Sequence, residues 1–520
     1  MGRVLKALYA VSLFAFSPLI LSGQTGRVSY SVAPPDDTHE RGFRYKAPEC
    51  SFIKSDDPSG SYFHISMTGH HYTSQTGEPE LPVMVKTVTV PAGSYVNAVV
   101  SGIRTTSINL KDHGLKGMLL YPSQPETTKN EAPDEKVRFI DRKSYKRNGI
   151  IEHDTVSVKL IGRWRGRDIW EVEINPAFYN PKGEVLDLIT SMDVKVSYSS
   201  SKGSAATIPV EDYEAAEQKS QINGYSDYPT GLIILTDTIF KKGLKPFIDW
   251  KTQSGYDVKV LYTGTGNAGT TFDEIKAALS SLYSNLAVLG KTPDYLLIVG
   301  GLSLIPSSGG TTNVSDLYYS EFDGNGDYLP ELYTGRIPVA DTTQLRVVMK
   351  KITDYEKCRF LSSSDFWRRA LTTAGNDAGY QLFMNSQVNY LRSNYFNLSN
   401  GIDGYGWYYP SSPQKDDSLK ILINRGLSIL NYTGHGEPAG LADPTLKVSG
   451  IPSLTNTGMY PLVVANACRT AELDAPSCFG KEMLLAEKKG AIGYIGCTND
   501  SYWTEDFYWS VGVGTPDMSA

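Results

Sequence analysis

The chain has 520 residues, of which 40% are hydrophobic and 20% are charged, with a formal net charge of −6 at pH 7. This composition is typical of a folded protein rather than a disordered one, and the length predicts two or more domains. The small negative charge and the lack of a basic block in the sequence argue against nucleic acid as a partner.

The first residues, 1–24, have the pattern of a secretory signal peptide. Arg3 and Lys6 precede an apolar run over 7–21, and the small residues Ser22 and Gly23 follow it. The run is too short for a good membrane-spanning helix, and no later apolar segment reaches the ~20 residues that a span needs. The sequence therefore predicts an exported protein, secreted or at the cell surface, without a further transmembrane segment.

Residues 25–205 are predicted to form an all-β, sandwich-like domain. Hydrophobic and polar residues alternate over Val156–Leu160 and again over Met192–Tyr198, which is the period of a half-buried strand. Turn-forming residues such as Asn180–Gly183 separate these runs. Residues 206–228 are polar and follow a Ser-rich stretch, so we expect an exposed interdomain linker that is easily cut.

From residue 229 onward, apolar runs of strand length alternate with helical patterns, which predicts an α/β domain with a mostly parallel sheet over 229–520. The expected strands are 232–235, 258–261, 295–300, 370–374, 427–432, 462–465 and 491–495. Helical spacing of apolar residues occurs at 240–248 and 272–289. Active groups of parallel sheets gather at the carboxyl ends of strands, so residues that follow these runs are the candidate site residues.

Two of the apolar runs are followed by reactive side chains, His435 and Cys468. A thiol is a nucleophile only as thiolate, and an adjacent imidazole takes its proton and stabilises the anion. Attack on an acyl group also needs backbone N–H groups directed at the oxyanion, which Gly436 and Cys468 can supply. Each side chain alone also fits a buried core residue, but the pair at two strand ends favours a nucleophile and its base.

The motif Asn431–Gly436, followed by Ala467–Cys468, resembles the gingipain family of cysteine peptidases, which share the caspase-like catalytic fold. The resemblance covers about residues 229–510. It continues through Leu297–Gly300, Gly335–Ile337, Cys478–Phe479, Gly490–Gly493 and Ser501–Trp503. The N-terminal half, with Gly77–Pro82 and Val90–Gly93, resembles the propeptide of secreted enzymes of this kind.

The resemblance implies a zymogen whose β-rich prodomain covers the active site until the linker is cut. Its partners are then protein or peptide substrates and its own prodomain. Cys468 is implied as the nucleophile, His435 as the general base and acid, and Asp377 as the carboxylate that orients the histidine. Two alternatives stay open: a permanent β accessory module, and an ordinary loop carboxylate at Asp377.

The family is known for cleavage after lysine or arginine. Asp506, Trp503 and Thr433 resemble the pocket residues of the lysine-specific branch, whereas the arginine-specific branch keeps its acidic residue near the position of Tyr380. Lysine is therefore favoured over arginine. Glu505 stands next to Asp506, so the alternative register stays open, as does a solvated turn at this place.

Catalysis of this kind requires no cofactor. The one metal ion that the resemblance suggests is a structural calcium ion. Asp323, Asn325 and Asp327 alternate as the ligands of calcium loops do. Tyr328, however, stands where an EF-hand has glycine, which makes a plain polar turn the preferred interpretation.

Two other functions stay open: a sortase-like transpeptidase of the type IX secretion system, from the same family, and a non-catalytic surface module with a degenerate site. Family members usually continue into further domains beyond the position of Ala520. The sequence is thus interpreted either as a fragment that lacks C-terminal domains or as a member without them.

Overall fold

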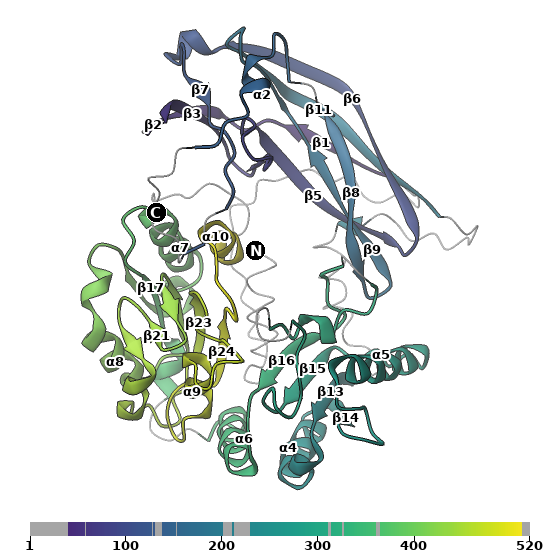
Figure 1. Ribbon diagram of the computed structural model, residues 1–520, viewed down its shortest axis with the longest axis vertical. Helices are drawn as coiled ribbons and strands as arrows, with labels where there is room; N and C mark the ends of the chain where they lie inside the picture. Colours follow the sequence, from purple (N-terminus) through teal and green to yellow (C-terminus); the bar gives the residue numbers. More distant parts are fainter. Residues whose placement is uncertain are drawn as a thin grey trace.

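The computed structural model describes residues 40–57, 59–126, 128–129, 138–151, 153–200, 211–212, 229–309, 314–324, 327–359 and 364–511. The predicted signal peptide lies outside this part of the chain, as does most of the predicted linker. A β-rich part precedes an α/β part (Figure 1), in agreement with the predicted fold class. None of the helices in the described ranges has the length and apolar character needed to cross a membrane.

Within its described residues, the β-rich part consists of three sheets, with strand orders β1-β11-β10, β12-β5-β9-β8 and β2-β3-β7; β6 pairs with β11, and β4 with β5. Its elements are β1 Glu40–Lys46, β2 Cys50–Asp57, β3 Gly60–Met67, β4 His71–Tyr72, β5 Pro82–Pro91, β6 Ser94–Asn109, η1 Leu110–His113, β7 Leu119–Leu120, α2 Arg142–Lys146, β8 Val156–Trp164, β9 Arg167–Ile174, β10 Ala177–Asn180, β11 Val185–Ser200 and β12 Glu211–Asp212. The short strand β12 falls within the predicted linker and pairs with β5.

Strand β11 illustrates how the alternating pattern produces this fold. Met192, Val194, Val196 and Tyr198 are all buried and share one hydrophobic core with residues of β5 and β9. Leu160 of β8 belongs to the other predicted alternation, yet it is exposed, because β8 is an edge strand and has a bulge at this point.

The α/β part holds two parallel sheets, β14-β13-β15-β16 and β18-β17-β19-β23-β24, so the sheet expected from the sequence is divided. The first half contains β13 Thr230–Thr236, η2 Thr238–Phe240, α4 Lys241–Gln253, β14 Tyr256–Tyr262, α5 Phe272–Val288, β15 Tyr295–Val299, η3 Leu317–Tyr319, β16 Tyr333–Ile337 and α6 Thr342–Glu356. The second contains η4 Ser364–Arg368, β17 Arg369–Ala374, α7 Gln381–Asn394, η5 Leu398–Asn400, β18 Asp403–Trp407, η6 Ser412–Gln414, α8 Asp416–Arg425, β19 Ile429–Thr433, β20 Gly436–Glu437, β21 Gly440–Leu441, β22 Leu446–Lys447, η7 Val448–Ser453, β23 Leu462–Asn466, α9 Phe479–Leu485, β24 Gly493–Gly496 and α10 Trp503–Val511.

The sequence of β13 is a continuous apolar run, as expected for a strand with helices over both of its faces. Ile234 packs into the core formed with α4 and α6, whereas Ile233 and Leu235 pack into the core formed with α5. Helix α5 begins at a capping box, in which Thr271 and Glu274 satisfy each other's backbone N–H groups. Local sequence signals therefore determine both the strand and the helix that covers it.

Lys351 of α6 connects the two halves of the α/β part. Its buried Nζ donates to the carbonyl oxygens of Met483 (3.5 Å), Leu484 (2.8 Å), Lys489 (3.0 Å) and Ala491 (3.2 Å), at the end of α9 and before β24. Burial lowers the pKa of Lys351 to about 7. The carbonyl oxygens oppose this shift because they accept hydrogen bonds from the charged form.

Replacing Lys351 should therefore destabilise the fold far more than replacing its neighbour. We expect Lys351→Met to lower the free energy of unfolding by about 2–4 kcal/mol, because buried carbonyl oxygens lose their donor. Lys350→Met removes only an exposed pair with Asp354 and should cost less than about 1 kcal/mol. Urea denaturation of both variants measures the difference, and equal losses would contradict a joining role for Lys351.

Candidate active site

The register of three parallel strands brings the candidate residues to one edge of the second sheet. Ala374 of β17 pairs with Thr433 of β19, and Thr433 pairs with Asn466 of β23. His435 comes two residues after Thr433, and Cys468 comes two residues after Asn466, the partner of Thr433. Because paired parallel strands end side by side, the loops that carry the two side chains leave the sheet next to each other.

Asp377 lies directly beside His435, with its Oδ2 atom 3.0 Å from Nε2 of the ring. Its other oxygen accepts hydrogen bonds from the backbone N–H groups of Gly379 (2.8 Å) and Tyr380 (3.2 Å). The Asp377 side chain is 6% exposed and that of His435 is 32% exposed. A fixed, mostly buried carboxylate can orient the ring and leave Nδ1 for proton exchange.

The loops that carry His435 and Cys468 touch at Gly436. A Cβ atom at this glycine would lie 2.8 Å from Cβ of Ala467 and 3.2 Å from the carbonyl oxygen of Cys468. Any side chain here would push the two loops apart, so glycine permits the close approach. The backbone of Gly436 is thus next to that of Cys468, as an oxyanion site formed by both requires.

Cys468 is fully buried, and its Sγ accepts a hydrogen bond from the backbone N–H of Ser501 at 3.3 Å. A backbone donor directed at the sulfur stabilises negative charge on it. Ser501 precedes α10, so this helix is tied to the loop of Cys468. Sequence analysis did not identify Ser501 in this role.

A segment of the β-rich part lies against the same stretch before α10. Thr128 forms an antiparallel bridge with Tyr502, and the N–H of Lys129 donates to the carbonyl oxygen of Ser501 at 3.0 Å. Figure 1 shows α10 on the side of the α/β part that faces the β-rich part. Ser501 therefore contacts both Lys129 and Cys468, through opposite groups of its backbone.

The side chain of Lys129 enters a closed pocket and is 0% exposed. Its Nζ donates to the carbonyl oxygens of Asn466 (2.6 Å) and Gly434 (3.5 Å), and it forms an ion pair with the carboxylate of Asp506. Three acceptors match the three N–H donors of an ammonium group. Burial raises the pKa of Asp506, and the charge of Lys129 opposes that rise.

Trp503 links this pocket to His435. The Nζ atom of Lys129 lies 4.5 Å from the centre of the indole, within the range of a cation–π contact. Tyr380 stacks on the indole at 5.0 Å, and His435 meets its edge at 5.4 Å. One nearly buried aromatic side chain thus forms a pocket wall and packs against the imidazole.

Buried polar side chains support the pocket from behind. The Nδ2 atom of Asn466 donates to Oε1 of Gln387 (3.2 Å) and to Oγ of Ser510 (2.8 Å), which holds the strand end whose carbonyl oxygen accepts from Lys129. Thr433 is also buried, but its Oγ1 has no hydrogen-bond partner within the described ranges. Its part in the pocket stays a prediction.

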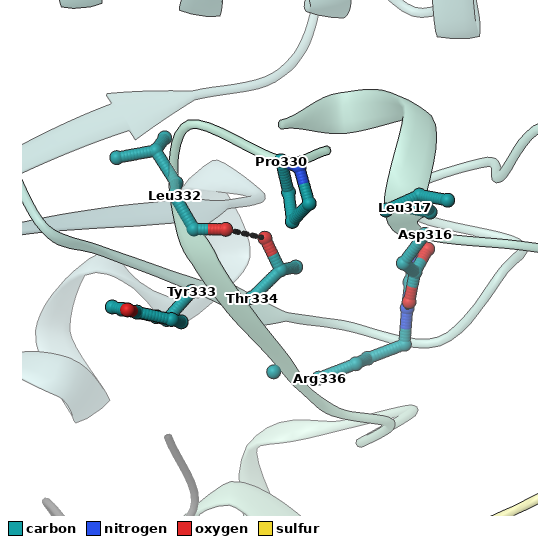
Figure 2. A pocket seen from close by; sticks show the side chains of 8 residues that line it. Asp316, Leu317, Pro330, Leu332, Tyr333, Thr334 and Arg336 are labelled. Carbon is teal, nitrogen blue, oxygen red and sulfur yellow. Dashed lines mark hydrogen bonds and ion pairs between the residues drawn. The ribbon is translucent and has the colours of Figure 1, made fainter. Parts of the chain in front are cut away.

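A separate pocket of about 360 Å³ lies beside β16, on the first sheet (Figure 2). Arg336 in its wall is almost completely buried and paired through two nitrogens with Asp316. Another guanidinium nitrogen donates to the carbonyl oxygens of Gly300 and Ile305. These contacts pair the charge of Arg336 and hold the surrounding loops together. None of the residues that line this pocket belongs to the site at Cys468.

The predicted calcium residues make other contacts. Asp327 accepts hydrogen bonds from the backbone N–H groups of Arg163 (2.5 Å) and Leu329 (2.9 Å), and Asp323 lies 4.0 Å from the Arg163 guanidinium. Asn325 is outside the described residues. In the parts of the chain that the structure describes, no group of three or more His, Cys, Asp or Glu side chains could hold a metal ion. The calcium prediction gains no support.

Comparison with known families matches both parts of the chain. Residues 225–514 match peptidase family C25, and residues 40–227 match the propeptide of that family. The chain belongs to peptidase family C25. The family and the fold class predicted from the sequence are confirmed.

Within this family, Lys-gingipain from Porphyromonas gingivalis is 32% identical over 484 residues, which are 89% of this chain and 28% of that protein. Gingipain R1 from the same species is 23% identical over 495 residues, 88% of this chain and 47% of that protein. A solved structure described as a protease is 34% identical, with a TM-score of 0.51 over 55% of this chain and 64% of that one. The chain thus spans less than a third of the length of Lys-gingipain.

The structure places most of the predicted residues around one centre, although it leaves their chemical roles as predictions. Asp377 contacts His435, which packs on Trp503, and Asp506 faces the same pocket. Sequence analysis missed Lys129, because its stretch has no strand or helix pattern and its ion-pair partner is 377 residues away.

The covered position of Cys468 predicts slow alkylation in the intact chain. Iodoacetamide should modify Cys468 far more slowly than the exposed Cys358. Lys129→Ala should accelerate the reaction at Cys468 about tenfold or more, the change expected from losing about 1.4 kcal/mol of contact. Peptide mapping by mass spectrometry follows each thiol. Lys143→Ala, on an exposed turn of α2, is the control, and equal rates in the two variants would refute the covering role.

Proposed function

We propose that the chain is the propeptide and catalytic part of a cysteine endopeptidase that cleaves proteins after lysine, and that Lys129 keeps it latent. The observation that carries the proposal is the buried ammonium of Lys129 between Asp506 and the face of Trp503. The backbone of the same residue bonds to Ser501, beside the Cys468 sulfur. Lys129 thus occupies the place that a substrate lysine takes once the propeptide has left.

In the proposed reaction, Sγ of Cys468 attacks the backbone carbonyl carbon of the substrate lysine, while His435 takes the thiol proton. The C–N bond then breaks, His435 returns the proton to the leaving amine, and a thioester remains. Water adds to the thioester, His435 accepts its proton, and the C–S bond breaks to restore the thiol. Asp377 orients the ring, and the N–H groups of Gly436 and Cys468 stabilise the oxyanion.

Three acceptors packed closely around one nitrogen favour lysine over arginine in this pocket. An ammonium is a compact point charge with three donors, whereas a guanidinium is a wide planar fork. Similarity supports the same preference, because Lys-gingipain is 32% identical to the chain and Gingipain R1 is 23% identical.

Export and activation complete the proposal. The signal-like residues 1–24 support export to the cell surface or beyond, and the match of residues 40–227 to a propeptide supports synthesis as a zymogen. A cut within 206–228 separates the two parts of the chain. The natural order is then export, cleavage of the linker, and withdrawal of Lys129 from the pocket.

The decisive test compares the linker-cleaved protein with its Cys468→Ala variant on a library of peptides. The wild type should hydrolyse bonds after lysine, and the variant should retain the fold but no hydrolysis above background, because the attacking sulfur is gone. Equal hydrolysis by the two proteins would refute the proposal. Products joined to an added amine, instead of free acids, would identify a transpeptidase, and no turnover by the wild type even after the cut propeptide has been removed would identify a non-catalytic module.

The identity of the pocket carboxylate is tested by two neighbouring variants. Asp506→Asn should lower kcat/KM for lysyl peptides about 10- to 100-fold, because a charge-assisted contact to the ammonium is lost. Glu505→Gln removes a carboxylate that is exposed, and it should change kcat/KM less than about threefold. The reverse order of effects would show that Glu505 is the residue that recognises the substrate.

A further inference from the structure

The β8–β9 hairpin of the β-rich part makes a second contact with the α/β part. Its two-residue turn, Arg165–Gly166, has positive φ at both positions, 50° and 74°. This is the turn geometry that suits a twisted hairpin, but a positive φ is unfavourable for a residue with a Cβ atom. Contacts made by the Arg165 side chain offset that cost.

Arg165 binds a carboxylate and an aromatic ring of the α/β part. Its guanidinium lies 2.7 Å from Oδ1 of Asp294 and 5.8 Å from the ring centre of Tyr333. The ring centre of Trp164, its neighbour in the hairpin, is 5.3 Å away. Both charged side chains are mostly buried, at 20% and 29% exposure, so solvent weakens this ion pair less than a surface pair.

The neighbouring bulge of β8 fits against a second carboxylate. The backbone N–H of Arg163 donates to Oδ2 of Asp327 at 2.5 Å. A Cβ atom at Gly162 would collide with the Asp327 carboxylate, so only glycine allows the strand to come this close. The contact is therefore matched in shape as well as in charge.

This contact is separate from the pocket that holds Lys129. Asp294 immediately precedes β15 and Tyr333 begins β16, so both are at the amino ends of strands in the first sheet. Lys129 lies at the carboxyl ends of strands in the second sheet, beside Asn466. Figure 1 shows the β8–β9 hairpin reaching toward the first sheet, away from α10.

We propose that Asp294, Asp327 and Tyr333 form a second binding site for the propeptide, which retains it on the catalytic part after the linker is cut. The inference rests on the proposed function in treating the β-rich part as a propeptide. Two attachments on one folded body keep each other at high local concentration, so loss of Lys129 from its pocket does not by itself release the propeptide. Release also requires the β8–β9 hairpin to dissociate from Asp294 and Asp327.

The experiment uses the full chain with Cys468→Ala and with the recognition sequence of an unrelated protease inserted between residues 213 and 228. After the cut, size-exclusion chromatography and dissociation kinetics report whether the two fragments stay together. The wild-type hairpin should hold them at about 0.05 M salt and release them faster at about 0.5 M, because salt screens the partly exposed charges. Lys129→Ala should leave the fragments together at low salt.

Substitutions in the hairpin and its site give the sharper comparison. Arg165→Asp should raise the dissociation rate about 10- to 100-fold, and adding Asp294→Arg to that variant should restore it to within about threefold. Gly162→Ala, which keeps every charge, should also accelerate release. Arg147→Asp, at an exposed position of the β-rich part, should leave the rate unchanged.

Separation of the wild-type fragments at once after the cut, an unchanged rate in Arg165→Asp, or no restoration by Asp294→Arg would each overturn the inference. The readout involves no catalysis. A failed peptide-cleavage assay would therefore count against the proposed function while leaving the binding result to stand or fall by itself.

Discussion

The parallel pairing of β17, β19 and β23 is the constraint on which the site depends. Backbone hydrogen bonds hold adjacent strands about 4.8 Å apart, and the matched register makes the loops after Thr433 and Asn466 leave the sheet together. The loops that carry His435 and Cys468 are therefore neighbours because their strands are neighbours, whatever the segments between the strands contain. Gly436 completes the arrangement by letting the two loops touch, and Asp377 lies three residues after the end of β17, the third strand of the set.

A buried charge needs a partner, and this requirement connects the β-rich part to the candidate active site. Asp506 alone would be a desolvated carboxylate, and Lys129 alone a desolvated ammonium; together with two carbonyl oxygens they satisfy each other. On the proposed function, latency and lysine preference then have one physical origin. On that function, the pocket that binds the propeptide lysine also recognises the substrate, so a release mechanism has to act outside it.

The two contacts of the β-rich part differ in their physical character. The Lys129 ammonium is completely buried, between Asp506 and two carbonyl oxygens. The hairpin contact at Asp294 is partly exposed, with an arginine in a turn that its partners help to stabilise. A completely buried contact contributes specificity, while a partly exposed charged contact responds to salt and to competing charges. A propeptide held by both can remain in place during storage and still be released when the surroundings change.

The sequence by itself predicted seven strands of the α/β part and the helices at 240–248 and 272–289, because their apolar periods are local patterns. Strands β16 and β18, which lack an apolar run, were not predicted. It also predicted that His435 and Cys468 follow strands, and the motifs Asn431–Gly436 and Ala467–Cys468 carried the resemblance to the family. Only the tertiary structure decided that the expected sheet is two sheets, that Ser501 faces the sulfur, and that Lys129 fills the pocket. The contact of Ser501 with Cys468 spans 33 residues and that of Lys129 with Asp506 spans 377. Nothing in the sequence around Lys129 indicates that it pairs with a carboxylate. Long-range packing brings such groups together, and local propensity does not record it.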